Sequence, residues 1–112
     1  MTNPILSAVL STCEDKKAEN IATYDLKSPQ FTDFAVVCCA QNTIQIKAIA
    51  SELQLAIKDK RIPASDILSS GNANSGWVIL EIPGIVCIHI TLQSIRDYYD
   101  LDGVYSRRMG KA

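Results

Sequence analysis

Three carboxylates stand where strand ends are expected, a placement that suits metal-dependent chemistry. Asp25 comes near the end of one expected strand, Asp33 opens the next, and Glu81 lies on a later strand. Such a trio could hold Mg²⁺ for nucleotidyl transfer, in which paired metal ions clamp the attacking and leaving oxygens. That reaction also needs a loop that cradles the triphosphate, and no glycine-serine loop stands near Asp25. We therefore expect no catalytic residue, no metal and no cofactor, while a degenerate or active Mg-dependent nucleotidyltransferase stays open as an alternative.

The only histidine and the four cysteines are a second set of reactive side chains. His89 follows Cys87 by two residues on an expected strand, so both side chains point to the same face. At this spacing they stand about 7 Å apart, too far for the hydrogen bond of a nucleophilic pair. His89 is therefore interpreted as a hydrogen-bonded strand residue. The cysteines include no Cys-x-x-Cys pair, so free thiols are favoured over a zinc site.

Length, composition and charge limit the kinds of partner. The 112 residues are 47% hydrophobic with a net charge of −1, which excludes a disordered tail protein. Nucleic-acid binders need clustered cations, so we expect no direct sequence-specific contact with nucleic acid. The apolar runs are too short to span a membrane. No cation precedes the apolar stretch 5–10 and no arginine precedes Arg61, so we expect no targeting signal and assign the chain to the cytoplasm.

Hydrophobic spacing, capping residues and turn residues predict eight elements in the order α-β-β-α-β-β-β-α. Two residue pairs resemble capping boxes, Asn42 with Gln45 and Ser94 with Asp97. We predict an α/β (α+β) fold, a single compact domain with a mixed sheet of about five strands and three helices. This domain covers residues 1–105, and a flexible basic tail covers 106–112. The expected helices are 3–17, 42–60 and 94–101, and the expected strands are 20–26, 34–40, 66–70, 77–82 and 85–91.

Two local patterns add detail to the predicted sheet. The strand Phe34–Ala40 is apolar on both faces, which indicates that it is covered on both sides. The turn between the last two strands contains Pro83-Gly84. An L-proline does not fit the two-residue primed turns, so we predict a wider loop or a bulge there.

Six blocks of sequence follow one another between about Leu10 and Leu101. They are Asp15-Lys16-Lys17-Ala18-Glu19-Asn20-Ile21, Asp25-Leu26, Thr32-Asp33-Phe34, Gly76-Trp77-Val78, Val86-Cys87-Ile88-His89-Ile90 and Arg96-Asp97-Tyr98-Tyr99-Asp100-Leu101. Together they resemble the Iojap or ribosomal silencing factor (RsfS) family over nearly the whole chain. The chain departs from the family at Glu81, at the turn Pro83-Gly84-Ile85, and at Gly103 and Tyr105.

The resemblance implies a fold related to nucleotidyltransferases but without their catalytic loop, and a protein that is not an enzyme. Family members look like silencing factors that bind the large-subunit ribosomal protein uL-fourteen and sterically block joining of the ribosomal subunits, which represses translation. The implied partners are uL-fourteen and the large ribosomal subunit, with a homodimer when the chain is free. A role in large-subunit assembly, as in organelle relatives, stays open as an alternative.

The resemblance and the residue types together indicate a partner-binding set. Trp77 is the preferred anchor because it is the only tryptophan and tryptophans lead interface hot spots, while a core-edge position stays open. Strand alternation places Trp77, Ile79 and Glu81 on one face. Tyr98 and Tyr99 cannot share a helix face, so we expect one to pack inward and the other to reach the partner. The full set is Thr32, Asp33, Trp77, Ile79, Glu81, Tyr98, Tyr99 and Asp100, with Thr32 and Asp33 included only because they match a family block.

The charge of the C-terminal part supports a basic partner. Residues 81–102 have a net charge of −3, from four acidic residues against Arg96. An acidic surface here suits a basic ribosomal protein, because complementary charge speeds encounter and sets orientation. The alternative is that the basic tail folds back and neutralises this surface.

Overall fold

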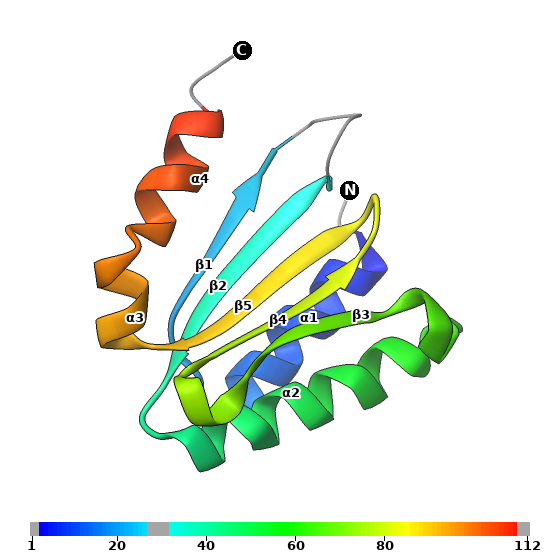
Figure 1. The fold of residues 1–112 in the computed structure, drawn as a ribbon. Coiled ribbons are helices and arrows are strands. Elements are labelled where there is room, and N and C mark those ends of the chain that lie inside the picture. The colour runs from blue at the N-terminus through cyan, green and yellow to red at the C-terminus, as the bar shows by residue number, and fades with distance from the viewer. Residues whose placement is uncertain (1–2, 27–31, 110–112) are drawn as a thin grey trace.

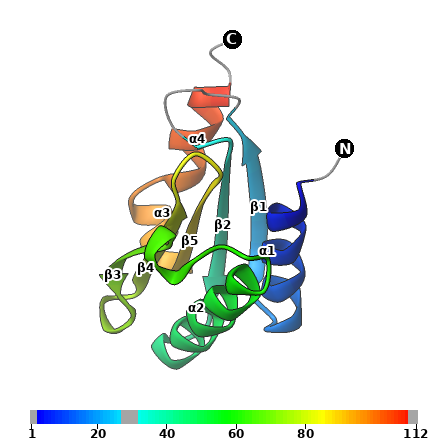
Figure 2. The ribbon, with the colours of Figure 1, turned by 90° about the vertical axis from the view of Figure 1, so that its right-hand side faces the viewer.

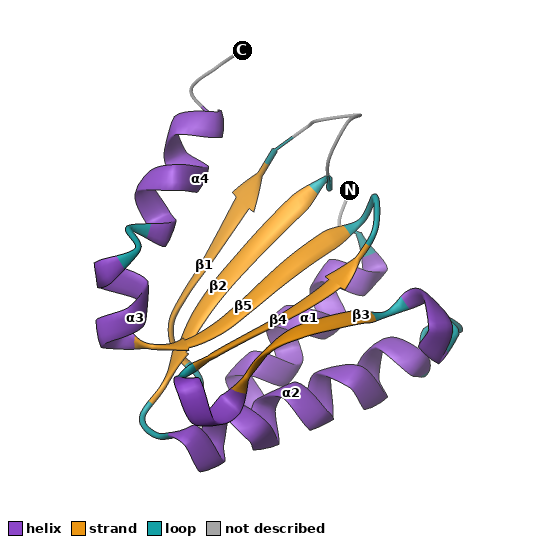
Figure 3. Cartoon of the chain, in the orientation of Figure 1, coloured by secondary structure: helices purple, strands orange, loops and turns teal. Residues whose placement is uncertain are grey.

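The computed structural model describes residues 3–26 and 32–109, which form a five-stranded mixed sheet with helices on both faces (Figure 1). The strands are β1 (Glu19–Asp25), β2 (Phe34–Ala40), β3 (Leu68–Asn72), β4 (Trp77–Ile82) and β5 (Val86–Leu92). The helices are α1 (Pro4–Asp15), α2 (Thr43–Lys58), α3 (Gln93–Tyr98) and α4 (Leu101–Met109), with single 3₁₀ turns η1 (Ala64–Asp66) and η2 (Ala73–Ser75). Figure 3 separates helices from strands by colour. The predicted α+β class with a mixed sheet is confirmed.

The central strands β2 and β5 determine the layout of the sheet. The strand order is β1-β2-β5-β4-β3, in which β2 and β5 run parallel and the other neighbours run antiparallel. Residues 35–40 of β2 are all buried, as the apolar run predicts for a strand covered on both sides. Helices α1 and α2 pack on one face, and α3 and α4 pack over β1, β2 and β5 on the other (Figure 2).

Helix α2 forms where the sequence places an apolar stripe at helical spacing behind a cap. The Asn42 side chain accepts a hydrogen bond from the Gln45 N–H (2.8 Å), which confirms this predicted cap. The stripe faces the sheet and is fully buried. Its residues are Ile46, Ile49, Leu53 and Ile57. Across the described part of the chain, no helix has both the length and the apolar composition to cross a membrane.

The prediction of one final helix is wrong, because the chain turns between α3 and α4. Asp100 has a φ of +49°, in the left-handed region that ends a helix. Its carboxylate then accepts a hydrogen bond from the Gly103 N–H (3.2 Å) and so caps α4. A Cβ at Gly103 would overlap this carboxylate, so a larger residue there would displace the Asp100 side chain from its capping position. Ser94 does not cap α3, because the residue before this helix is Leu92 and makes no side-chain cap.

The β4–β5 connection is the wider loop that Pro83 predicts. The Ile85 N–H donates to the Ile82 carbonyl oxygen (2.9 Å), and Gly84 has a φ of +83°. Proline at the second position and a positive-φ glycine at the third define a type II turn. This geometry lets β4 and β5 pair along their whole length.

Two boundaries differ from the sequence expectation. Strand β3 begins and ends two residues later than predicted, at Leu68 and Asn72. Gly71, with a φ of +82°, lets β3 approach the Trp77 carbonyl so closely that a Cβ would overlap the oxygen. At the C-terminus, α4 continues to Met109, so residues 106–109 of the expected tail are helical. Residues 110–112 of that tail lie outside the described residues.

Replacing Gly71 with alanine should destabilise the protein more than replacing Gly84. An alanine at either position adopts a left-handed φ, which costs about 1–2 kcal/mol. Only at Gly71 would the new Cβ also overlap a backbone carbonyl, which adds about 1–3 kcal/mol, whereas nothing lies within 4 Å at Gly84. Chemical denaturation of the two variants measures the difference. Equal losses in the free energy of unfolding would contradict the close approach of β3 to β4.

Candidate functional site

The structure separates Glu81 from Asp25 and Asp33, the other two carboxylates that could have formed a metal site. Asp25 and Asp33 lie at neighbouring ends of β1 and β2, where the Leu26 N–H donates to the Asp33 carbonyl oxygen (2.9 Å). Glu81 lies on β4, and two strands stand between β4 and β1. At about 4.8 Å per strand this separation is roughly 14 Å. Within residues 3–26 and 32–109, no group of three His, Cys, Asp or Glu side chains could hold a metal ion, and the four cysteines are unbridged.

One face of β4 and β3 stays accessible to solvent beside α3 and α4. Trp77, Ile79 and Glu81 alternate with buried residues and share this face, as predicted, and each is half-buried. The strand register adds Leu68, which pairs with Glu81 and exposes 53% of its surface. Leu68 is absent from the predicted set, although its position in the weak strand expected there could have indicated it. We call the surface formed by Leu68, Trp77, Ile79 and Glu81 the open face.

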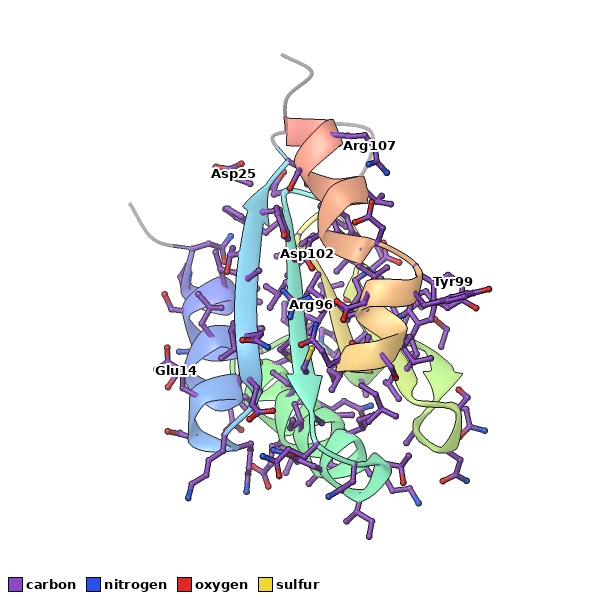
Figure 4. The ribbon with its side chains drawn as sticks, turned by 90° about the vertical axis from the view of Figure 1, so that its left-hand side faces the viewer. Glu14, Asp25, Arg96, Tyr99, Asp102 and Arg107 are labelled. Carbon is purple, nitrogen blue, oxygen red and sulfur yellow. The ribbon has the colours of Figure 1, made fainter. Side chains whose placement is uncertain are left out.

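Three aromatic rings, Trp77, Tyr98 and Tyr99, form what we call the aromatic patch at the border of the open face. The Tyr99 ring centroid lies 5.0 Å from that of Trp77, and Tyr98 meets Tyr99 edge to face at 4.9 Å. Tyr98 exposes 80% of its surface and Tyr99 50%, so the expectation that one of them packs inward is wrong. Tyr99 keeps the helical backbone, with its N–H donating to the Ile95 carbonyl oxygen (3.1 Å), but its ring meets the half-buried Trp77 instead of the core. Figure 4 shows Tyr99 projecting outward from the turn between α3 and α4.

Thr32 and Asp33 lie away from the aromatic patch. They precede β2 at the end of the sheet that carries the β4–β5 turn, whereas Trp77 lies at the opposite end of β4. Thr32 is buried, and its hydroxyl donates to the Phe34 carbonyl oxygen (3.2 Å). Asp33 is exposed. The structure therefore does not bring these two residues together with the rest of the predicted set.

Arg96 is buried between α3 and the sheet and fixes the C-terminal helices. Its guanidinium forms a bidentate pair with Asp102 of α4, with N–O distances of 2.7 and 2.9 Å, and Figure 4 shows the two side chains pointing toward each other. It also donates to the Asn20 carbonyl oxygen of β1 (2.5 Å) and to the Cys39 sulfur of β2 (3.3 Å). The Tyr24 hydroxyl donates to Asp102 as well. The hydrogen bond from Arg96 is the main reason that the pKa of Asp102 falls to about 2.

His89 is buried in β5, and both of its ring nitrogens have partners, which confirms the interpretation as a hydrogen-bonded strand residue. The Trp77 indole N–H donates to Nδ1 (3.0 Å), and Nε2 lies 2.7 Å from the Tyr105 hydroxyl. The expected separation from Cys87 is wrong, because the imidazole leans along the strand and brings Nε2 within 3.7 Å of the sulfur. Nδ1 accepts from the indole, so Nε2 carries the proton and cannot accept one from Cys87. Burial lowers the pKa of His89 to about 4.

Ion pairs reduce the acidic surface that the charge count predicts. Asp102 is paired with Arg96, and Arg107 of α4 lies 3.4 Å from Asp100. Both members of the Asp100–Arg107 pair are 66% exposed, so this contact contributes little to stability. The alternative in which C-terminal cations neutralise the surface therefore holds in part. Glu81 and Asp97 have no ion-pair partner among the described residues.

Comparison with protein families gives one match along nearly the whole chain. The model of the family RsfS, described as "Ribosomal silencing factor during starvation", matches residues 2–111. Three curated proteins named Ribosomal silencing factor RsfS are similar as well. The one from Chromobacterium violaceum is 29% identical over 103 residues, which cover 90% of this chain and 81% of that protein. Those from Halalkalibacterium halodurans and Bacillus subtilis are each 26% identical over 102 residues, covering 90% of this chain and 85% and 84% of theirs.

Solved structures show the same fold. A crystal structure of a Chromobacterium violaceum protein superposes with a TM-score of 0.81 at 27% identity, covering 91% of this chain and 83% of that one. A crystal structure of a Bacillus halodurans protein gives a TM-score of 0.75 at 28% identity, covering 90% of this chain and 92% of that one. The sheet and helices described above are therefore shared with these proteins.

Because of His89, the free energy of unfolding should decrease as the pH is lowered from about 6.5 to about 4. The unfolded imidazole has a pKa near 6.5 and the folded one about 4, so the unfolded state binds more protons in this window. The stability that comes from burying a neutral His89 is fully present above pH 6.5 and is lost as the pH falls through 4. The total loss in the free energy of unfolding is up to about 3 kcal/mol. Denaturation midpoints at several pH values measure this slope.

A His89→Gln variant is the control, because it removes the only histidine in the chain. Asp102 does not interfere, since its lowered pKa contributes stability that is lost only below about pH 3.8. The same slope in the wild type and the variant would contradict the assignment to His89.

Proposed function

Because the chain belongs to the family of ribosomal silencing factors (RsfS), we propose that it binds the large ribosomal subunit through uL-fourteen and sterically blocks joining of the small subunit. This action represses translation in the cytoplasm and requires no catalysis. The observation that carries the proposal is the aromatic patch beside the open face. Large aromatic rings exposed next to apolar strand residues are typical of a protein-binding surface.

The composition of the patch fits the centre of an interface. Trp77 is half-buried against Tyr99, so its ring is held in place while part of it stays accessible. Tyrosine and tryptophan are the residues most enriched among interface hot spots. Ile79 and Leu68 extend the apolar surface along β4 and β3. A partner that covers this surface removes apolar area from water, which is the main source of favourable free energy in association.

The charges around the patch favour a basic partner. Glu81 lies on the open face, and Asp97 and Asp100 flank the two tyrosines in sequence. The exposed Asp100–Arg107 pair can exchange for a pair with a cation of the partner at little cost. A lysine or arginine of the partner could also lie over an exposed tyrosine ring, where a cation is attracted to the π-electrons. These features suit a basic ribosomal protein.

The dimensions of the molecule are sufficient for steric exclusion. The chain exposes 6529 Å², and an interface of standard size takes about 800 Å² from each partner, roughly an eighth of this surface. The molecule measures 36 × 33 × 22 Å along its principal axes, and the part outside the interface would stand on the subunit surface. Exclusion is reciprocal, so the small subunit weakens binding of this protein as much as this protein weakens binding of the small subunit.

A Trp77→Ala variant should bind free large subunits at least about 30-fold more weakly than the wild type, the loss typical of a tryptophan hot spot. Co-sedimentation of the protein with purified large subunits measures the affinity. The variant should also fail to reduce joining when small subunits are added. Unchanged co-sedimentation would contradict the proposed surface.

Tyr98→Ala provides an independent test, since Tyr98 is 80% exposed and its removal leaves the core intact. Ile44→Ala is its matched control, because Ile44 is 79% exposed but lies on α2, on the other face of the sheet. We expect Tyr98→Ala to weaken binding and Ile44→Ala to leave it unchanged. If Ile44→Ala weakens binding as much, the surface on α2 is the interface and the proposal is wrong.

A further inference from the structure

We propose that His89 is a positioning residue for the Trp77 anchor, holding the indole at one fixed place beside the open face. The indole N–H donates to His89 Nδ1 at 3.0 Å, and the two rings lie 5.9 Å apart. This inference rests on the proposed function, because it concerns the same binding surface. It assigns to the buried histidine a role in recognition without any contact to the partner.

The hydrogen-bonding capacities of Trp77, His89 and Tyr105 determine which group donates and which accepts in each bond. An indole N–H only donates, so His89 Nδ1 must accept and must be unprotonated. The proton of the neutral ring is therefore on Nε2, which lies 2.7 Å from the Tyr105 hydroxyl oxygen and donates to it. A histidine with this tautomer offers Trp77 a permanent acceptor. Burial favours the neutral ring, so the acceptor persists at physiological pH.

The surroundings of His89 keep the imidazole itself in place. It lies in the middle of the sheet, between Val37 of β2 and Ile79 of β4 in the strand register. Tyr105 of α4 covers it, with ring centroids 5.6 Å apart, and Tyr105 in turn stacks on Tyr24 of β1 at 5.6 Å. His89 Nδ1, the acceptor that faces Trp77, is thus held in place by β1, β2, β4 and α4.

Trp77 also packs against an apolar cluster of β2 and α4, formed by Ala35, Val37, Leu101 and Tyr105. Trp77 is the first residue of β4 and follows Gly76, which has a φ of +90°. Its other aromatic neighbour, Tyr99, is half-exposed and sits in the turn between α3 and α4. Apolar contacts of this kind are not directional, so the bond to His89 is what sets the orientation of the indole before binding. Fixing a side chain in its bound position before association avoids the entropy cost of ordering it in the complex.

Two substitutions of His89 separate the two hydrogen bonds. In His89→Asn the side-chain amide occupies the position of Nδ1, so an acceptor for Trp77 remains while the bond to Tyr105 is lost. In His89→Gln the amide reaches the position of Nε2, so the bond to Tyr105 remains while the acceptor for Trp77 is lost. We expect His89→Gln to weaken binding to large subunits about three- to tenfold, the effect of one hydrogen bond. His89→Asn should stay within about twofold of the wild type.

A double-mutant cycle tests whether His89 acts through the indole N–H. Trp77→Phe keeps an aromatic ring but removes the donor. In this background His89→Gln should cause no further loss of affinity, because the bond is already absent. Additive losses, or equal losses for His89→Asn and His89→Gln, would overturn the inference.

The free protein provides a readout that does not depend on the ribosome. Because Trp77 is the only tryptophan, a ¹⁵N–¹H correlation spectrum contains a single indole N–H signal. This signal should be protected from hydrogen exchange in the wild type and in His89→Asn, and should exchange faster in His89→Gln. Unchanged exchange in His89→Gln would overturn the inference. If the wild type does not bind large subunits at all, the proposed function fails, and the indole signal alone decides whether His89 positions Trp77.

Discussion

Arg96 places a full positive charge in the interior, where a charge is costly unless its N–H groups find partners. It donates to Asp102 of α4, to a β1 carbonyl and to a β2 sulfur, so one side chain joins both C-terminal helices to two strands. Asp102 keeps its outer side in contact with water, at 41% exposure, which limits the desolvation cost of the pair. The turn between α3 and α4 is anchored by this pair. The positions of the exposed Tyr98 and Tyr99 therefore depend on Arg96, although Arg96 lies in the interior and the two tyrosines lie at the surface.

The Arg96–Asp102 pair, by anchoring α3 and α4, also determines which part of the sheet is covered and which is not. Helices α1 and α2 cover one face, while the short α3–α4 pair, held over β1, β2 and β5, covers only part of the other. Trp77 stands at the boundary, with its N–H directed inward to His89 and its ring against Tyr99. It is both a core-edge residue and an accessible one, so the two interpretations that the sequence leaves open are compatible. In this arrangement the packed interior supports the exposed surface that we propose for partner binding.

The parts of the fold that depend on local sequence could be predicted, and those that depend on distant contacts could not. The bounds of β2 match the prediction because its apolar run is unbroken, and those of β4 match because Gly76 and Pro83 stand on either side of it. Helix α2 follows from its stripe and the Asn42 cap. The break between α3 and α4 comes at the left-handed Asp100, and the cap that its carboxylate forms with the Gly103 N–H appears only in the structure. The bond from Arg96 to Asn20 joins residues 76 positions apart, which no spacing argument can reach. At the candidate site, strand alternation predicted the shared face of Trp77, Ile79 and Glu81. It could not exclude Thr32 and Asp33, because their distance from Trp77 depends on strand order.

The proposed function requires this protein to occupy the surface of the large subunit that the small subunit needs, with the aromatic patch against that surface. The most direct measurement is an electron cryo-microscopy reconstruction of the wild-type protein bound to free large subunits. We expect density for one copy against uL-fourteen, with Trp77 at the contact and the body of the domain overlapping the position of the docked small subunit. Density that contacts the subunit through α1 and α2, or that leaves room for the small subunit, would contradict it.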